Sequence, residues 1–176
     1  KDGYCGVVAG VSAKNNHEIM FLLDLDERAQ LKECPKFSGM EGTSTWAIEL
    51  RDYFVNEEQL IADPVRPFIK RVRPAFVLLQ TGFGLGVTQG AIDSMVEVEG
   101  SLGHVNQFLH DRPSALQPEL DRVKSKIHEL SSDIFSGSPE MLVDVLDVRA
   151  QVSELSLRAT QSALLHQGAR GYLMSS

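Results

Sequence analysis

The spacing of hydrophobic residues changes near residue 63. Before it, short apolar runs lie between polar, turn-forming segments, a pattern typical of β-strands; the first two runs are residues 4–11 and 18–25. Residues 44–55 alternate between apolar and polar side chains, as a strand with one buried face does. The apolar face would carry Trp46, Ile48 and Leu50, and the polar face Thr45, Glu49 and Arg51. We therefore expect at least three antiparallel strands over residues 1–62.

After residue 63, apolar residues recur at every third or fourth position, which is the period of a helix that packs on one side. We expect three helices, at about residues 65–100, 113–135 and 138–168. The Asp63-Pro64 pair marks the start of the first helix, with Asp63 as the cap and Pro64 at the first helical position. Pro67 and Pro74 mark candidate kinks in that helix.

Long amphipathic helices joined by short links are typical of an up-down bundle. The predicted fold class is therefore α+β, with a partial antiparallel β unit followed by an up-down bundle of long helices. The change of pattern divides the chain into two expected domains, residues 1–62 and residues 63–176.

The chain is acidic overall, with 24 Asp and Glu residues against 17 Lys and Arg and a formal net charge of -7. Such a charge disfavours binding to nucleic acid or to an anionic membrane through bulk electrostatics, so we predict neither partner. The main basic segment is residues 66–73. Its charges, spaced along one predicted helix, indicate a solvated face or a subunit contact more readily than a ligand site.

Sequence signals for metal, thiol or nucleophile chemistry are weak. Cys5 and Cys34 form no CxxC pair, and the five histidines show no HxxxH or HExxH spacing, so we predict neither a disulfide framework nor a metal site. No G-x-S-x-G elbow marks a nucleophile, and we assign no catalytic residue. The apolar run at residues 75–87 is short and interrupted by Gln80 and Thr81. We therefore expect no membrane span, and a reducing cytoplasm fits best.

The first predicted helix contains an unusual concentration of glycine, at positions Gly82, Gly84, Gly86 and Gly90. Read as a dinucleotide fingerprint, Gly84-x-Gly86 supplies two glycines, but the third position is Gln89 and the flanking sequence predicts helix instead of a strand. The alternative is that small residues allow another helix backbone or a flat ligand to approach. Since each mid-helix glycine costs roughly 0.5–1 kcal/mol relative to alanine, we favour this packing interpretation and predict no ligand contact at the four glycines.

Three motifs, in the correct order, resemble the acyl-CoA dehydrogenase superfamily. Residues 37–63 resemble the end of its middle β domain through Gly39, Gly42, Thr43, Ser44, Thr45, Asp52, Val55, Glu58 and Leu60. The long helix that follows is similar to the family's G-x-x-x-G-A-x-D stretch through Gly86, Gly90, Ala91 and Asp93. Residues 163–173 are similar to its A-L-Q-x-x-G-G-x-G-Y motif through Gly168, Gly171 and Tyr172, with Ala169 in place of the second paired glycine.

The resemblance implies a flavoenzyme that holds FAD between a β domain and a helical bundle. The adenosine-diphosphate end would reach a neighbouring subunit of a homodimer or homotetramer, and the substrate would be an acyl thioester oxidised at a CH–CH bond. The cofactor-binding residues that it implies are Gln117, Gly168, Ala169 and Gly171. Residues 1–62 would be a partial middle β domain and residues 63–176 a helical domain that is incomplete at its C-terminus. The chain would then be a fragment or an abbreviated member that is inactive alone.

Other positions depart from the family pattern. The arginine that contacts the FAD pyrophosphate falls at Asn106, and Arg112 could replace it only through a different geometry. The glutamine of the last motif falls at Leu165. One family location for the catalytic glutamate falls near Phe76, and the other lies beyond Ser176. These departures leave two alternatives open: a flavin-dependent monooxygenase of the same superfamily, and a non-catalytic oligomerising helical module.

Overall fold

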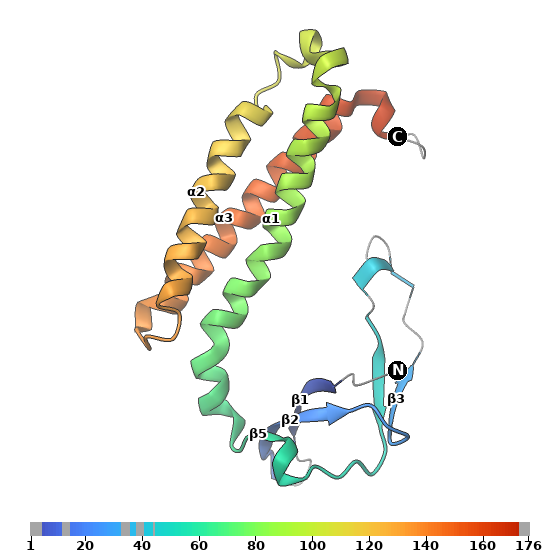
Figure 1. The fold of residues 1–176 in the computed structure, drawn as a ribbon, viewed down its shortest axis with the longest axis vertical. Helices are drawn as coiled ribbons and strands as arrows, with labels where there is room; N and C mark the ends of the chain where they lie inside the picture. The colour runs from blue at the N-terminus through green and yellow to red at the C-terminus, as the bar shows by residue number, and fades with distance from the viewer. Residues whose placement is uncertain (1–4, 12–14, 33–35, 38–40, 44, 173–176) are drawn as a thin grey trace. The chain divides into compact units, whose positions relative to one another are not determined.

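The computed structural model describes residues 5–11, 15–32, 36–37, 41–43 and 45–172. Cys34, Gly39 and Ser44, which the sequence analysis used, lie outside these ranges. The chain divides into two compact units, Lys1–Lys70 and Arg71–Ser176. The fold class is α+β as predicted, because antiparallel strands come first and three long helices follow (Figure 1).

The first unit contains two small antiparallel sheets. Strands β1 (Cys5–Val11), β2 (Glu18–Asp24) and β5 (Leu60–Ala62) form one sheet in the order β1-β2-β5, and β3 (Ala29–Lys32) pairs with β4 (Ala47–Leu50) in the other. The strands predicted at residues 4–11 and 18–25 are confirmed as β1 and β2. Strands β3 and β5 were not predicted, because four and three residues are too few to show an alternating pattern.

The core of this unit is small. Phe21, Leu23 and Ala29 are buried, and the ring of Tyr53 stacks on Phe21 with 6.1 Å between ring centroids. The prediction of a buried apolar face at β4 is wrong for the described residues, since Ile48 is 44% exposed and Leu50 is 40% exposed. The β3–β4 ribbon is two-stranded, and a ribbon without a covering layer leaves apolar side chains in solvent.

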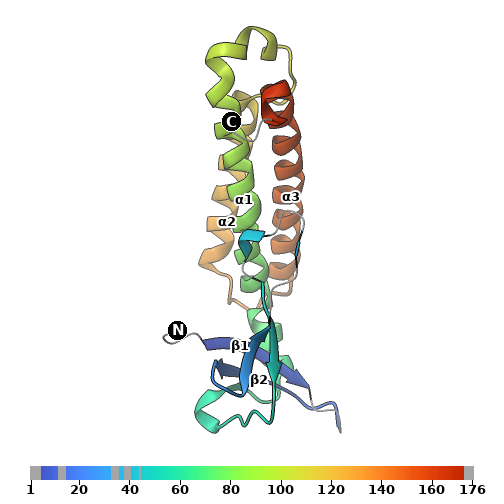
Figure 2. The same cartoon turned by 90° about the vertical axis from the view of Figure 1, so that its right-hand side faces the viewer.

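Three helices form the second unit and run up, down and up beside one another (Figures 1 and 2). They are α1 (Val65–Asn106), α2 (Pro113–Ser132) and α3 (Pro139–Gln167); short 3-10 turns are η1 (Glu41–Thr43), η2 (Glu57–Gln59) and η3 (Gly168–Tyr172). Helix α1 begins at Val65 as predicted, although Pro64 lies just before its first residue, and it is continuous through Pro74 to Asn106. The start of α3 is as predicted, because the Ser138 hydroxyl accepts a hydrogen bond from the Glu140 amide at 3.2 Å.

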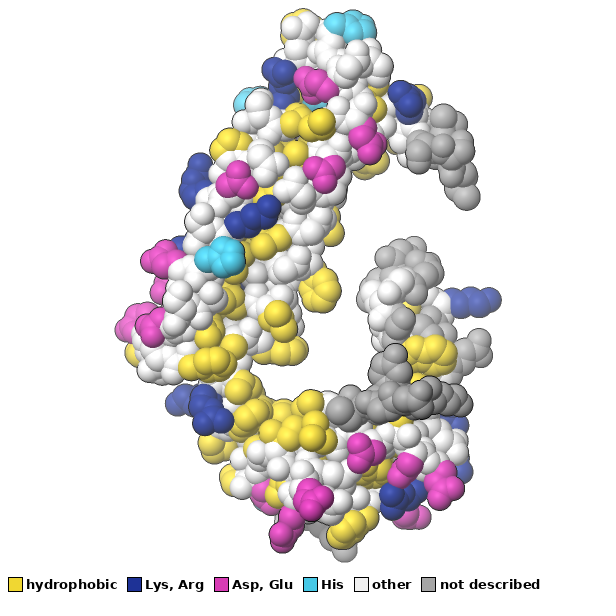
Figure 3. Space-filling view, viewed as in Figure 1, with side chains coloured by type: hydrophobic (Ala, Val, Ile, Leu, Met, Phe, Trp, Pro, Cys, Tyr) yellow, Lys and Arg dark blue, Asp and Glu magenta, His cyan; other side chains and the backbone are white. Residues whose placement is uncertain are grey.

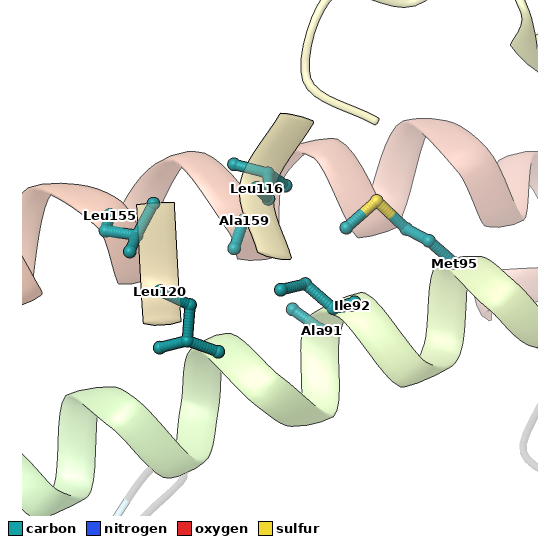
Figure 4. Close-up of a cluster of buried hydrophobic side chains, with 7 residues drawn as sticks. All are labelled: Ala91, Ile92, Met95, Leu116, Leu120, Leu155 and Ala159. Atoms are coloured by element: carbon teal, nitrogen blue, oxygen red, sulfur yellow. The ribbon is translucent and has the colours of Figure 1, made fainter. Parts of the chain in front are cut away.

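Two hydrophobic clusters hold the helices together. All three helices contribute to the first cluster, whose members are Ala91, Ile92, Met95, Leu116, Leu120, Leu155 and Ala159 (Figure 4). The second lies nearer the other end of the bundle and contains Val77, Leu78, Leu130, Met141, Val145 and Val148. Each large apolar side chain removed from water contributes about 1.5–3 kcal/mol, so these clusters are the main source of stability in the unit.

Helix α1 also passes a length and composition test for a membrane span, unlike any other helix of the described chain. The expectation that no segment would do so is therefore wrong, because residues 74–92 carry no charge and the interrupting Gln80 and Thr81 do not offset their neighbours. The core helix of a soluble protein passes the same test. Since α1 supplies residues to both clusters, its length and composition are weak evidence for a membrane location.

Candidate functional site

A buried polar network joins the C-terminal ends of α1 and α3. The Asn106 amide, 6% exposed, donates a hydrogen bond to the backbone carbonyl of His166 at 3.1 Å. His166 is 1% exposed, and its Nδ1 lies 2.8 Å from the Ser162 carbonyl, which assigns the ring proton to Nδ1. The Ser162 hydroxyl donates to the Asp111 carbonyl. These bonds fix the connection between α1 and α2 against the end of α3.

This network changes the interpretation of Asn106. Its side chain points inward to a backbone carbonyl, so it does not offer a donor to a pyrophosphate at the surface. Arg112, the alternative cation, lies 3.6 Å from Glu99 and therefore already has an acidic neighbour. Asn106 therefore does not supply the cation that the family has at this position, and Arg112 is paired with Glu99 in this structure.

The predicted cofactor residues Gly168, Ala169 and Gly171 lie in η3, directly after α3. Gly168 ends α3 with a positive φ of 54°, a conformation that favours glycine, and its amide donates to the Leu164 carbonyl. All three residues are exposed. They are therefore placed where a ligand could reach their backbone.

A pocket of about 520 Å³ lies between α1, the last turns of α3 and η3. Its lining consists of Val87, Ala91, Ser94, Glu97, Val98, Thr160, Ala163, Leu164, Gln167, Arg170 and Gly171. The Gln167 amide donates to both the carbonyl and the hydroxyl of Ser94 at 2.8 Å, which ties the end of α3 to α1. Of the predicted cofactor residues, only Gly171 lines this pocket.

Gln117 occupies a different place, on α2. Its side-chain amide exchanges long hydrogen bonds of 3.3 and 3.4 Å with Gln89 of α1 and donates to Asp121 at 3.1 Å. Lys124 also donates to Gln89, at 3.2 Å. The structure therefore does not bring Gln117 into the pocket that Gly171 lines, and its amide already has partners within the bundle.

The glycines of α1 fall into two groups. A Cβ atom at Gly84 would lie 2.3 Å from a methyl carbon of Val152, so α3 packs closely there and the packing prediction is confirmed at this position. A Cβ at Gly82, Gly86 or Gly90 would meet nothing within 4 Å among the described residues. Within the described residues, the packing prediction is therefore wrong at those three positions.

The three unpacked glycines form a row, because a spacing of four residues places them on one side of a helix. Exposed apolar side chains of α1 lie beside the row: Phe76, Leu79, Phe83 and Val87, which are 63%, 77%, 80% and 50% exposed. We call these seven residues the open face of α1. Figure 3 shows hydrophobic side chains gathered over this part of the helix. No charged residue lies between residues 74 and 92.

Electrostatic pairing is concentrated on another side of the bundle. The Arg158 guanidinium of α3 lies 2.6 Å from Asp111 and 2.9 Å from Glu119 of α2. The hydrogen bond from Arg158 lowers the pKa of the Asp111 carboxyl below its ordinary value, and the two carboxylates raise the pKa of Arg158. This triad pins the α1–α2 connection to α3, with Arg158 donating four hydrogen bonds to the two carboxylates.

Neither a base at the family's position near Phe76 nor a cluster of metal ligands is found in the described part of the chain. Phe76, near one family location of the catalytic base, is an exposed aromatic residue without a titratable group. Among residues that the structure describes, no cluster of three His, Cys, Asp or Glu side chains could hold a metal ion. No local sequence pattern marks the Asn106–His166 contact or the contacts of Arg158, since the partners lie 39 to 60 residues away.

No protein-family model matches this chain, and no curated protein matches it at a significant level.

Proposed function

We propose that this chain is part of an FAD-dependent oxidoreductase similar to acyl-CoA dehydrogenases, acting on a CH–CH bond of an acyl thioester. In this proposal the segment contributes part of the flavin site and a subunit contact of a cytoplasmic homodimer or homotetramer. The observation that carries the proposal is the open face of α1, where three glycines with free space beside them lie next to exposed apolar side chains.

The open face has the properties that a flat aromatic ligand requires. Glycine lacks a side chain, so a planar ring could approach the backbone at Gly82, Gly86 and Gly90. The backbone amides within an α-helix are already hydrogen-bonded, so the surface is effectively apolar. Flavin sites are mostly apolar with few polar anchors, and a bound flavin would supply hydride acceptance. The chain's own contribution would be to bind and orient the ring and to exclude water from it.

Packing within the described bundle does not explain Gly82, Gly86 and Gly90. A solvent-facing glycine in a helix costs roughly 0.5–1 kcal/mol relative to alanine, and three of them together cost about 1.5–3 kcal/mol. At Gly84 close packing against Val152 explains the absence of a side chain. At the other three positions a ligand or partner outside the described residues would have to provide the compensation.

The experiment is FAD uptake by the intact gene product, purified and then titrated with FAD. The proposal predicts a yellow protein with bound-flavin absorbance near ~450 nm and reduction of that flavin by an acyl-CoA substrate. A protein that binds no FAD would contradict it. Oxygen uptake with reduced flavin and no acyl-CoA turnover would instead support the flavin-dependent monooxygenase.

A second candidate function is a non-catalytic oligomerising helical module. The inward orientation of Asn106 favours it, because the usual pyrophosphate contact is absent from that position. The open face would then be covered by protein instead of flavin, since exposed apolar patches of this kind mark interaction sites. Light scattering that shows a stable oligomer, combined with no flavin binding, would support this candidate over the flavoenzyme.

A further inference from the structure

We infer that His166 makes the junction of α1 and α3 acid-sensitive, because a second proton on its buried ring would release the connection between α1 and α2 from the end of α3. The connection comprises residues 107–112. Histidine is the side chain whose ordinary titration lies nearest to physiological pH. This inference goes beyond the proposed function, since it holds or fails whether or not the protein binds a flavin.

The His166 ring is enclosed, and only one of its two nitrogens is hydrogen-bonded. The residue is 1% exposed, and its Nδ1 donates to the Ser162 carbonyl at 2.8 Å. The Ser162 hydroxyl lies 3.3 Å from the same nitrogen. The other nitrogen, Nε2, is buried and has no hydrogen-bond partner among the described residues. The ring therefore fits this place as a neutral imidazole with its proton on Nδ1.

A second proton would have to go to Nε2, since Nδ1 already carries one. It would create a charged N–H group that is out of water and lacks an acceptor, which is unfavourable for any buried group. Solvation of that group requires the last turn of α3 to move. Two bonds that hold the connection depend on this turn. Asn106 donates to the His166 carbonyl at 3.1 Å, and the Ser162 hydroxyl donates to the Asp111 carbonyl. Protonation and release of the connection are therefore coupled.

Three carboxylates at this end of the bundle already have cationic partners. Glu99 of α1 lies 3.6 Å from Arg112 of the connection. Arg158 of α3 binds both Asp111 and Glu119. The other titratable or charged groups at this end are Glu97 and His104 on α1, His110 on the connection and Arg170 on η3. None of these groups forms a hydrogen bond with the buried Nε2. A protonated ring would thus have no hydrogen-bonded counter-ion among the described residues.

The direction of the pH effect follows from proton uptake. In the unfolded chain the ring is in water and takes up a proton as pH falls through roughly 6.5. In the folded protein the same uptake requires the junction to open. The opened and unfolded states therefore bind more protons, so acid should lower the free energy of unfolding and open the junction before the rest of the bundle. The second hydrophobic cluster contains no histidine and should stay closed.

The test is amide hydrogen exchange of the intact gene product between about pH 8 and about pH 5, with rates corrected for the intrinsic effect of pH. The Gln107 and Leu109 amides bond to carbonyls of α1 and report on the connection. Their protection should fall at least about tenfold in acid, because each pH unit below the titration of the open state changes the opening equilibrium about tenfold. The Val145 and Val148 amides, in the second cluster, should keep their protection.

Two variants assign the effect to one ring. His166→Gln removes the titrating group and keeps a neutral polar side chain, so protection of the connection should no longer depend on pH. The matched control is His110→Gln, which removes an exposed histidine of the same connection and should behave like wild type.

Two results would overturn the inference: wild-type protection at the connection that is the same at both ends of the pH range, or an equal loss of protection in wild type and His166→Gln. If His166→Gln does not fold, the wild-type profile decides. Loss of protection confined to the connection and the end of α3 then supports the inference, and loss spread evenly over the bundle overturns it. FAD uptake has no part in any of these outcomes.

Discussion

The two faces of α1 are both apolar, yet only one is covered by the bundle. On the covered face, Ile92 and Met95 are buried against α2 and α3, and Gly84 lies close to Val152. On the open face, Phe83 is 80% exposed and Gly86 has free space beside it. Hydrophobic composition therefore does not separate a core face from a binding face. The difference lies in what each side chain, or each missing side chain, contacts.

The same contrast appears among the arginines near the end of the bundle. Arg158 is held by Asp111 and Glu119, so its charge stabilises the connection between helices. Arg170 has no such partner among the described residues and lines a pocket. A group whose partners are all within the fold has a structural role, whereas a charged group without such a partner in a pocket is a candidate ligand contact.

The largest effect should come from the covered face. Met95→Ala removes a side chain with 0% exposure and leaves a cavity between three helices, so it should lower the free energy of unfolding by about 2–5 kcal/mol. Leu79→Ala on the open face is the matched comparison and should cost less than about 0.5 kcal/mol, because Leu79 is 77% exposed. Chemical denaturation measures both; equal losses would show that the open face is covered in solution.

The next effect concerns the packed glycine. Gly84→Ala would place a methyl group against Val152, and overpacking of about 1–3 kcal/mol should exceed the gain of roughly 0.5–1 kcal/mol in helix propensity. We expect a net loss of about 1–2 kcal/mol in the same denaturation experiment. A stabilised Gly84→Ala protein would refute close packing of α1 against α3.

A smaller, pH-dependent effect should follow from the Arg158 triad. Because the pKa of Asp111 is lowered in the folded protein, its pairing stabilises the fold above the ordinary value of 3.8 and this contribution is lost as pH falls through the lowered pKa. Asp111→Asn should cost about 1 kcal/mol at pH 7 and nothing once wild-type Asp111 is protonated. Thermal unfolding across pH measures this. Asp144→Asn is the control, at an exposed residue without a partner among the described residues, and it should be neutral. Stability curves for Asp111→Asn that stay parallel to wild type across pH would contradict the assignment.

The smallest effect should have the opposite sign. Gly86→Ala adds a methyl group in free space on a helix, so it should stabilise the protein without ligand by roughly 0.5–1 kcal/mol. Differential scanning calorimetry would detect the higher unfolding temperature. Destabilisation by this change would mean that Gly86 is packed against protein, in favour of the oligomerising module.

The helices were predictable because their apolar periodicity and local start signals lie within a few residues. Pro113 and the Ser138-Pro139 pair mark where α2 and α3 begin, and the structure agrees. Strand β5 was not predictable, since its three residues acquire extended structure only by pairing with β2. Alternation at residues 44–55 predicted a buried face that is exposed at Ile48, because periodicity shows which residues share a face and not what covers that face.

The candidate site was less predictable for the same reason. The motif at Gly168–Gly171 is local, and the resemblance marked it. The contacts that position it, Asn106 with His166 and Gln167 with Ser94, join residues 60 and 73 positions apart. Nor could the sequence separate Gly84 from Gly86, since both are glycines of one helix and only the approach of α3 distinguishes them.

The open face of α1 is proposed to bind a flavin, and the FAD affinity of the intact gene product carrying Gly86→Trp tests this. The wild-type protein should bind FAD saturably, as measured by the change in flavin fluorescence. Gly86→Trp should weaken FAD binding at least about tenfold by filling the space beside the helix, with no decrease in the unfolding temperature. Gly100→Trp is the control, an equally unobstructed glycine of α1 outside the open face, and should bind FAD like wild type. Absence of saturable FAD binding, or equal affinity of both variants, would contradict the claim.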